Sequence, residues 1–254
     1  MEHEYYKEYY DLERNHWWFK AREEIIITAI KSLISRGDLK SGHLNILNVG
    51  CGPGRSSEYL SAFGTVTSIE YDAFCCEFAS KKTGLKIIHG SITELPFQDG
   101  VFDLVCAFDV IEHVENDTLA VAEMHRVAVA GGIKFVTVPA FMSLWSNHDV
   151  VNHHFRRYTT APLKKIFTGL QQTELFCSYF NFFLFPPIFF FRKLSNLIKS
   201  GSRRKGSGSD FEAFNPSLAN NILYRIFRGE RKFVRRRVKM PFGSSIVHIA
   251  KKTA

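Results

Sequence analysis

The chain has 254 residues, of which 45% are hydrophobic, and a formal net charge of +8. This length suits one large domain, or one domain with an insertion, and the composition supports a hydrophobic core. The N-terminus lacks the basic and apolar regions of a secretory signal, so we expect a cytoplasmic protein. The five cysteines are odd in number and show no CxxC spacing, which argues against a disulfide framework and against a zinc site.

The charge is unevenly distributed along the chain. Residues 1–191 carry 17 Lys/Arg against 22 Asp/Glu, a net charge of −5, whereas residues 192–254 carry 16 against 3, a net charge of +13. The strongly basic C-terminal quarter predicts an anionic partner for that part of the chain alone.

Hydrophobic patterns predict alternating helices and strands. Residues 21–35 predict a first helix with an apolar face, which ends near Gly37. Strands are predicted at 44–50, 65–70, 85–90, 102–109 and 132–139, with helices near 55–63, 73–82 and 117–129. Short apolar strands separated by helices indicate parallel βαβ units, so the predicted fold class is α/β with a doubly wound sheet.

The regular alternation ends after Pro139. Residues 140–160 are rich in His, Trp, Arg and Tyr and follow the fifth strand, where loops of an open α/β sheet form the ligand crevice. A helix over 161–170 and strands over 173–183 and 244–252 complete the pattern.

Residues 184–240 do not fit the βα alternation, and we interpret them as a helical insertion before the last strand. The catalytic domain would then comprise residues 1–183 and 241–254. The apolar run near Pro186-Pro187 is too short to span a bilayer. A basic amphipathic helix near 220–240 favours contact with an anionic membrane surface, while packing on the catalytic domain or a second subunit remains the alternative.

The stretch "NVGCGPGR" places three glycines between a strand and a helix. Gly50, Gly52 and Gly54 allow a tight turn and close approach to a ligand, although a plain turn would use the same residues. Arg55 occupies a position where dinucleotide folds need a small residue, and no Gly-Lys-Ser/Thr follows to make a P-loop. Glu70, at the end of the second strand, suits ribose hydroxyls.

Four motifs in order, "NVGCGPG", "SIEYD", "GSITELPFQDGVFDLV" and "AFDVIEHV", resemble class I S-adenosylmethionine-dependent methyltransferases over residues 40–140. The group resembled includes ubiquinone-biosynthesis-like enzymes. The resemblance implies a Rossmann-like, mostly parallel sheet with an antiparallel last strand. It implies S-adenosylmethionine as cofactor and S-adenosylhomocysteine as product. The residues expected to bind the cofactor are Trp18, Arg22, Gly50, Cys51, Gly52, Gly54, Glu70, Tyr71, Ser91, Ile92, Asp109 and His113.

Within this set, the resemblance implies distinct contacts. The glycine loop would pack on the methionine and ribose, Ser91 and Ile92 would flank the adenine, and Asp109 would lie near the methionine moiety. Ser91 departs from the family, which often has Asp there. The "HWWFKAR" motif would cover the cofactor, with Arg22 meeting its carboxylate; ordinary core aromatics with a solvated arginine are the alternative.

The loop "LWSNHDVVNHHFRRY" supplies the candidate catalytic residues, and its pattern resembles a loop of a methyltransferase subgroup. We expect His148, His154 or Asp149 to assist deprotonation of the acceptor, and Arg157 with Tyr158 to orient it. Alternatively, Asp149, Arg157 and Tyr158 pin the loop by mutual hydrogen bonds. The catalytic candidates are His148, Asp149, His154 and Tyr158, and the substrate-binding candidates are Trp145, Arg156 and Arg157. No acidic cluster or paired spacing accompanies the histidines, so no metal site is expected.

The predicted function is methyl transfer to the oxygen, nitrogen or carbon of a small or lipid-linked acceptor. A non-catalytic cofactor-binding or membrane-associated interaction module is the alternative. We expect a monomer or homodimer, cytoplasmic and peripheral to the membrane, with nucleic acid disfavoured as a partner.

Overall fold

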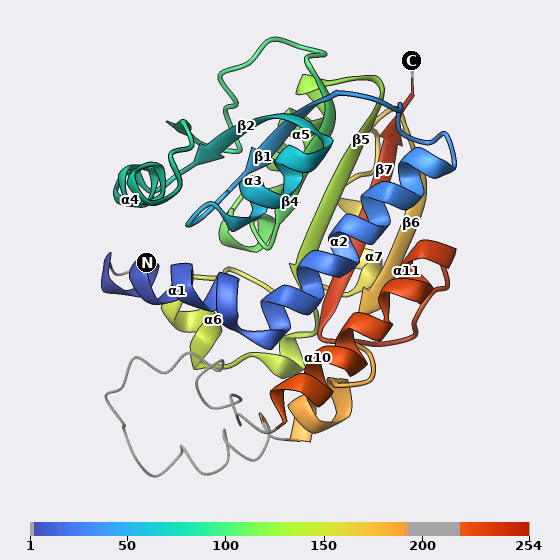
Figure 1. Cartoon of the computed structure of the whole chain (residues 1–254). Helices are drawn as coiled ribbons and strands as arrows, with labels where there is room; N and C mark the ends of the chain where they lie inside the picture. Colours follow the sequence, from blue (N-terminus) through green and yellow to red (C-terminus); the bar gives the residue numbers. More distant parts are fainter. Residues whose placement is uncertain (1–2, 191, 193–218, 254) are drawn as a thin grey trace.

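The computed structural model describes residues 3–190, 192 and 219–253 (Figure 1). Its centre is a seven-stranded sheet with the strand order β3-β2-β1-β4-β5-β7-β6. The strands are β1 (Leu44–Val49), β2 (Gly64–Glu70), β3 (Ile87–His89), β4 (Phe102–Phe108), β5 (Ala128–Pro139), β6 (Gln172–Phe180) and β7 (Ser245–Lys252). Strand β7 is antiparallel to both β5 and β6, and the other pairings are parallel, which confirms the predicted α/β fold.

The α-helices cover both faces and one end of this sheet. They are α1 (His3–Asn15), α2 (Trp17–Ser35), α3 (Arg55–Leu60), α4 (Ala73–Thr83), α5 (Asp117–Val127), α6 (Asn147–Val151), α7 (Thr160–Lys165), α10 (Asn220–Gly229) and α11 (Arg231–Arg236). The short 3-10 helices are η1 (Ser61–Phe63), η2 (Ile111–His113) and η3 (Met142–Leu144). Residues 185–190 are also helical.

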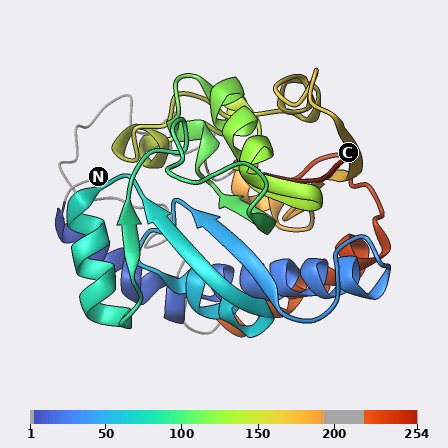
Figure 2. The same ribbon diagram turned by 90° about the horizontal axis from the view of Figure 1, so that it is seen from above.

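Two hydrophobic layers explain why these segments fold together. Leu104 and Phe135 point to the face covered by α2, α3 and α10, whereas Val105 and Val136 point to the face covered by α5 and α7 (Figure 2). Every residue of β4 is buried, as expected for a central strand covered on both faces. The sheet is therefore the middle layer of three.

The strand order predicts a crevice at the carboxyl ends of the central strands β1 and β4. From β1 the chain runs outward to β2 and β3, and it then returns to the other side of β1 as β4 and β5. The connections after β1 and β4 consequently leave on opposite sides of the sheet. The carboxyl ends of β1 and β4 form the switch point, which is where open α/β sheets bind ligands.

The C-terminal part of the predicted insertion packs on the main body. Phe227 of α10 is fully buried, with its ring centroid 6.0 Å from that of Trp18 on α2. Glu24 of α2 accepts hydrogen bonds from Tyr224, Arg228 and Arg231. Helices α10 and α11 thus cover the same sheet face as α2, whereas residues 193–218 of the predicted insertion lie outside the described residues.

The prediction of a single amphipathic helix at 220–240 is wrong, because this segment forms two helices, α10 and α11. Glu230 separates α10 from α11; its side chain is buried and accepts a hydrogen bond from Phe183 N at 3.1 Å. Ile222 and Ile226 are 61% and 39% exposed, so the apolar residues divide between the core and the surface.

Two further features follow from the described residues. All five cysteines are free and buried, which agrees with the absence of a disulfide framework in the prediction. In the described segments, no helix has both the length and the apolar character needed to cross a membrane.

Candidate active site

A cavity of about 810 Å³ opens at the carboxyl ends of the parallel strands. Its walls come from the ends of β1, β2, β4 and β5, from α1 and α2, and from the loop after β5. It therefore lies at the switch point of the sheet, where the sequence placed the ligand crevice. The predicted residues in its lining are Trp18, Arg22, Gly50, Cys51, Gly52, Glu70, Tyr71, Ile92, Asp109, His113, His148, His154 and Arg157.

The glycine loop turns sharply as it leaves β1. Gly50 and Gly52 have φ values of 63° and 53°, a backbone conformation that residues other than glycine rarely adopt. A Cβ atom on Gly50 would lie 2.5 Å from Cγ2 of Val110, whereas one on Gly52 would meet nothing within 4 Å. Gly50 is thus required by packing, and Gly52 leaves the backbone open for a ligand to approach.

Glu70 fixes the loop from the end of β2. Its Oε2 accepts a hydrogen bond from Gly52 N at 2.9 Å, and its Oε1 accepts from Tyr71 N at 2.8 Å and Asp72 N at 3.1 Å. Burial raises the pKa of Glu70 above its usual value, against the lowering effect of these three donors. The carboxylate lies at the cavity wall, where both oxygens can also accept from ribose hydroxyls.

Arg22 and Asp109 line the cavity and form a connected polar group with the buried Thr137. Arg22 Nη2 lies 2.7 Å from Asp109 Oδ2 and donates to Thr137 Oγ1 at 2.8 Å. Thr137 Oγ1 in turn donates to Asp109 Oδ1 at 3.1 Å. Asp109 itself has a φ of 56°, so its backbone is strained where β4 ends.

Arg22 keeps one donor unused. Its Nε is buried and has no hydrogen-bond partner among the residues that the structure describes. The guanidinium carbon lies 5.4 Å from the Trp18 ring centroid, within cation–π distance. This arginine is thus buried beside Trp18, and its Nε can still donate to a carboxylate; the cover of the cofactor by the "HWWFKAR" motif stays a prediction.

The predicted adenine contacts differ from each other. Ile92 is buried and lines the cavity. Ser91 Oγ instead lies 2.8 Å from Thr93 Oγ1 and accepts a hydrogen bond from Thr93 N at 3.2 Å. Neither Ser91 nor Gly54 is among the residues lining the cavity; Gly54 is the N-cap residue of α3. Their assignment to the cofactor stays a prediction.

The loop after β5 is held by a buried ion pair. Asp149 Oδ1 accepts from Arg157 Nε at 2.7 Å, and its Oδ2 accepts from Arg157 Nη2 at 3.0 Å and Ser146 N at 2.8 Å. Burial opposes ionisation of Asp149, but the hydrogen bonds from His154 and Arg157 and the Arg157 charge outweigh it. The pKa of Asp149 consequently lies below its usual range. This bidentate pair joins two of the three residues in the pinning alternative, whereas Tyr158 bonds to Asp117 instead.

A second anchor ties the same loop to α5. Asp117 Oδ2 accepts hydrogen bonds from Arg156 Nη1 at 2.6 Å and from Tyr158 Oη at 2.7 Å. Burial and this hydrogen bond raise the pKa of Tyr158 above its usual value. Four predicted site residues do not line the cavity and lie behind its wall: Trp145, Asp149, Arg156 and Tyr158.

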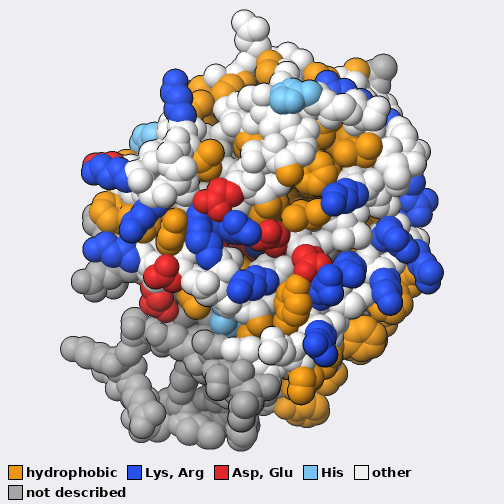
Figure 3. Space-filling view, viewed as in Figure 1, with side chains coloured by type: hydrophobic (Ala, Val, Ile, Leu, Met, Phe, Trp, Pro, Cys, Tyr) orange, Lys and Arg blue, Asp and Glu red, His pale blue; other side chains and the backbone are white. Residues whose placement is uncertain are grey.

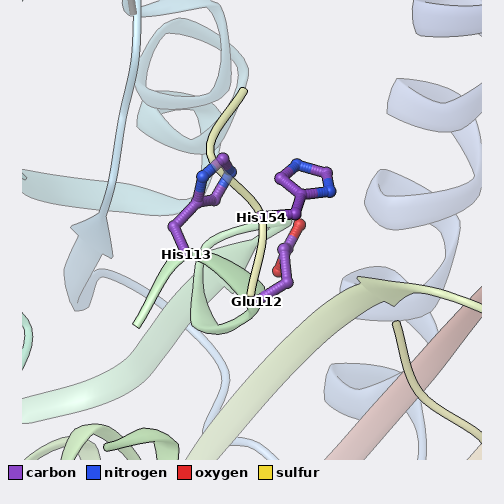
Figure 4. Close-up of side chains that lie close together, drawn as sticks. All are labelled: Glu112, His113 and His154. Carbon is purple, nitrogen blue, oxygen red and sulfur yellow. The ribbon is translucent and has the colours of Figure 1, made fainter. Parts of the chain in front are cut away.

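Glu112, His113 and His154 meet at the cavity wall, as Figure 4 shows. The rings of His113 and His154 are perpendicular, with centroids 4.4 Å apart. Burial and the nearby His154 lower the pKa of His113 to about 3, which keeps its ring neutral. Sequence reasoning missed Glu112, although its place directly before His113 in "IEHV" was the available signal.

The residues present fit the cofactor that the motifs imply. Gly52 leaves room above the backbone, Glu70 presents a carboxylate to a ribose, and Arg22 Nε is an unused donor for a carboxylate. Apolar Ile92 provides a surface for a planar base. Each part of an S-adenosylmethionine molecule thus has a chemically suitable group in one cavity.

Comparisons with known proteins agree with this geometry. Residues 47–136 match the family model described as "Methyltransferase domain". The chain is 26% identical over 159 residues to a probable S-adenosylmethionine-dependent methyltransferase of Mycolicibacterium smegmatis, covering 61% of this chain and 59% of that protein. It is 30% identical over 153 residues to demethylmenaquinone methyltransferase of Staphylococcus aureus, covering 55% and 61%. The match thus spans about three fifths of these relatives' length.

Solved structures share the fold at low sequence identity. A putative sarcosine dimethylglycine methyltransferase from Galdieria sulphuraria superposes with a TM-score of 0.57 at 14% identity, covering 89% of this chain and 84% of that one. A putative methyltransferase from Bacillus halodurans gives a TM-score of 0.52 at 19% identity, covering 89% and 99%. Together with the matching domain and the cavity, these findings show that the chain contains a methyltransferase domain with the fold of class I S-adenosylmethionine-dependent enzymes.

Proposed function

We propose that the protein transfers the methyl group of S-adenosylmethionine to a hydrophobic, lipid-linked acceptor. The observation that supports this is the composition of the cavity lining. Besides the residues expected to bind the cofactor, it includes apolar Leu184, Pro187 and Ile188 after β6, together with Leu223 of α10. One cavity therefore combines polar groups for the cofactor with apolar side chains, which suits an acceptor with an apolar tail.

Positioning is the main contribution expected from the protein. The bound cofactor supplies a methyl group already activated by its sulfonium, so the acceptor atom and the methyl carbon must be held in line. In this proposal Arg22 holds the carboxylate of the cofactor, Glu70 holds its ribose, and Trp18 shields the cavity from water. His148 and His154 line the cavity and are the candidates to accept a proton from an oxygen or nitrogen nucleophile.

The name of one relative supports an apolar acceptor. Demethylmenaquinone methyltransferase is named for a quinone acceptor, and this chain resembles it over 153 residues. The basis for extending this to the present chain is the apolar wall formed by Leu184 and Ile188. Demethylmenaquinone is accordingly a suitable first acceptor to assay.

A labelling experiment tests the proposal. The protein is incubated with methyl-labelled S-adenosylmethionine and with cell extract separated into lipid, small-molecule, protein and RNA fractions. We expect label in the lipid fraction. Label confined to protein or RNA would reject the acceptor class, and cofactor binding without any labelled product would favour the non-catalytic module.

Two matched variants locate the acceptor. Ile188→Asp places a charge in the apolar wall, whereas Phe190→Asp changes a side chain that is 70% exposed and does not line the cavity. We expect Ile188→Asp to raise KM for the lipid acceptor at least tenfold, because burying an unpaired charge is unfavourable. Phe190→Asp should leave KM unchanged. Equal effects would contradict this placement of the acceptor.

The surface over α10 and α11 supports a further proposal, that the protein lies on an anionic membrane. Figure 3 shows basic side chains gathered at the right, where Figure 1 places α11, with hydrophobic side chains below them. Exposed side chains there include Ile222 and Ile226 among the apolar ones and Arg225, Lys232, Arg235 and Arg236 among the basic ones. Such a combination suits an interface of anionic lipid.

Sedimentation with vesicles containing an anionic lipid tests the membrane proposal. The double variant Ile222→Asp, Ile226→Asp should lose binding at low salt, while Leu119→Asp on α5 should retain it, since Leu119 is exposed on the other face of the sheet. Wild-type protein that stays in the supernatant would reject the proposal. Cytoplasmic location, a monomeric or dimeric state and the absence of a nucleic-acid partner remain predictions.

A further inference from the structure

Three side chains with metal-ligating atoms converge at the cavity wall. Glu112 and His113 belong to η2, directly after β4, and His154 lies in the loop after β5. One ligand atom from each of the three lies within 4.8 Å of the others (Figure 4). The distances allow a single ion to contact all three at once.

Glu112 is the first independent sign of a ligand at this place. Its side chain is 0% exposed, and neither carboxylate oxygen has a hydrogen-bond partner within the described segments of the chain. A buried carboxyl group without partners is costly and rare in native proteins. A bound cation would compensate both oxygens.

The histidines show the second independent sign, because other groups fix their orientation. His154 Nδ1 lies 2.8 Å from Asp149 Oδ1, and Asp149 is itself held by Arg157. The ring of His113 packs perpendicular to that of His154, with the two centroids 4.4 Å apart. A histidine that donates one ring nitrogen to a carboxylate or carbonyl, leaving the other for an ion, is the usual arrangement around protein-bound metals.

We propose that Glu112, His113 and His154 bind one divalent transition-metal ion, with Zn²⁺ as the representative ion. Two imidazole nitrogens and one carboxylate oxygen suit zinc and similar ions, whereas Mg²⁺ and Ca²⁺ prefer oxygen ligands alone. Three protein ligands leave a coordination position open. Because all three residues line the cavity, that position faces the space where the acceptor is expected.

The role of the ion rests on the proposed function. An ion at this position would bind an oxygen atom of the acceptor and stabilise its deprotonated form, as metal ions do for bound water. This would favour O-methylation among the three chemistries that the sequence left open. His154 would then be a ligand, and His148 would remain as the candidate base.

Metal binding is tested without any acceptor. Chelator-treated protein free of a histidine tag is titrated with Zn²⁺ in competition with a chromogenic chelator, and Co²⁺ is added separately to record its absorption bands. We expect one tight Zn²⁺ per chain and Co²⁺ bands typical of mixed nitrogen and oxygen ligands. A wild-type protein that binds no Zn²⁺ at this ratio would overturn the proposal.

Variants assign the ion to these residues. Glu112→Gln and His154→Gln should each weaken Zn²⁺ binding by at least about tenfold. The control His43→Gln removes an exposed histidine that precedes β1, at the opposite end of the strand from the cavity, and should change nothing. Zn²⁺ affinity unaltered in both ligand variants would also overturn the proposal. S-adenosylhomocysteine binding confirms that each variant is folded.

The two proposals fail separately. Absence of Zn²⁺ binding together with labelled lipid would reject the metal site and retain the methyltransferase function. Stoichiometric Zn²⁺ binding without labelled product would retain the site and reject the proposed acceptor.

Discussion

Arg22 and Asp109 form an ion pair in the cavity, with 2.7 Å between Arg22 Nη2 and Asp109 Oδ2. The two residues come from α2 and from the end of β4, and they are 87 positions apart in the sequence. This pair holds the arginine in place and leaves its buried Nε without a partner in the described part of the chain.

If Arg22 Nε meets the cofactor carboxylate, Arg22→Ala should weaken S-adenosylhomocysteine binding by about 10- to 100-fold, the usual value of a charge-assisted hydrogen bond. Binding of 5′-methylthioadenosine, which has no carboxylate, should change much less. Isothermal titration calorimetry measures both affinities. Lys20→Ala, an exposed change on the same helix, is the control. Equal losses for the two ligands would contradict a carboxylate contact.

Glu70→Gln should also weaken cofactor binding, by roughly tenfold. The amide can accept from only one of its two terminal atoms, so it cannot keep the hydrogen bonds from Gly52 N, Tyr71 N and Asp72 N and also serve the ribose. Glu77→Gln on the surface of α4 is the matched control, because Glu77 pairs only with the exposed Lys81 among the ion pairs described. An unchanged affinity in Glu70→Gln would remove Glu70 from the cofactor site.

The buried Asp149–Arg157 pair should stabilise the loop after β5 against removal of either partner. Asp149→Ala leaves the Arg157 charge buried and unpaired, and we expect a loss of about 3–5 kcal/mol in the free energy of unfolding. The double variant Asp149→Leu, Arg157→Met should recover part of this loss. Urea unfolding measures both. If the double variant regains stability but not kcat, the pair also contributes to catalysis.

Tyr158 donates its hydroxyl to Asp117 and lies behind the cavity wall. Tyr158→Phe should therefore lower the free energy of unfolding by about 1 kcal/mol, the net value of a hydrogen bond, and leave kcat within about twofold. Tyr71→Phe, at a side chain with 75% exposure, should leave stability unchanged. A large fall in kcat for Tyr158→Phe at unchanged KM would instead support the predicted catalytic role.

Lys134 predicts a pH dependence of stability. Its side chain is 0% exposed and its Nζ lies 2.9 Å from His125 Nδ1; burial and the charge of Lys252 lower its pKa from 10.5 to about 8. Between these two values the unfolded chain binds more protons than the folded one, so this lysine makes stability rise with pH from about 8 to 10.5.

Lys134→Met should consequently be more stable than the wild type at pH 7, by up to about 3 kcal/mol, and this advantage should shrink toward pH 10. Denaturant unfolding at both pH values measures the difference, with the exposed Lys86→Met as control. If the stability gained by Lys134→Met does not change with pH, Lys134 titrates normally.

Much of the cofactor half of the site could be predicted from the sequence. Strand β1, the glycine loop and α3 are continuous in the chain. The turn between them is therefore local, and Gly50 and Gly52 predict it directly from the sequence. Glu70 and Asp109 end two strands adjacent to β1, and parallel strands bring their carboxyl ends together. The motifs therefore located the cavity before the structure did.

The acceptor half was predicted less well, because its residues owe their positions to packing between distant segments. The motif in residues 144–158 contains His154, Asp149 and Arg157, but it could not show whether these residues act in catalysis or fix the loop by hydrogen bonds. The structure shows the bidentate hydrogen bonds between the last two. The amphipathic pattern at 220–240 likewise could not show that Phe227 packs on Trp18.

The sequence by itself determined the α/β sheet and the methyl donor, and it predicted a place for the cofactor, because alternating hydrophobicity and short contiguous motifs encode these features locally. Only the tertiary structure decided that Glu112 and His113 meet His154, 41 positions further along the chain than His113. The connection from β4 through α5 and β5 brings these residues together. No spacing in the sequence encodes such a contact, because it depends on how the loop after β5 folds back over the carboxyl end of β4.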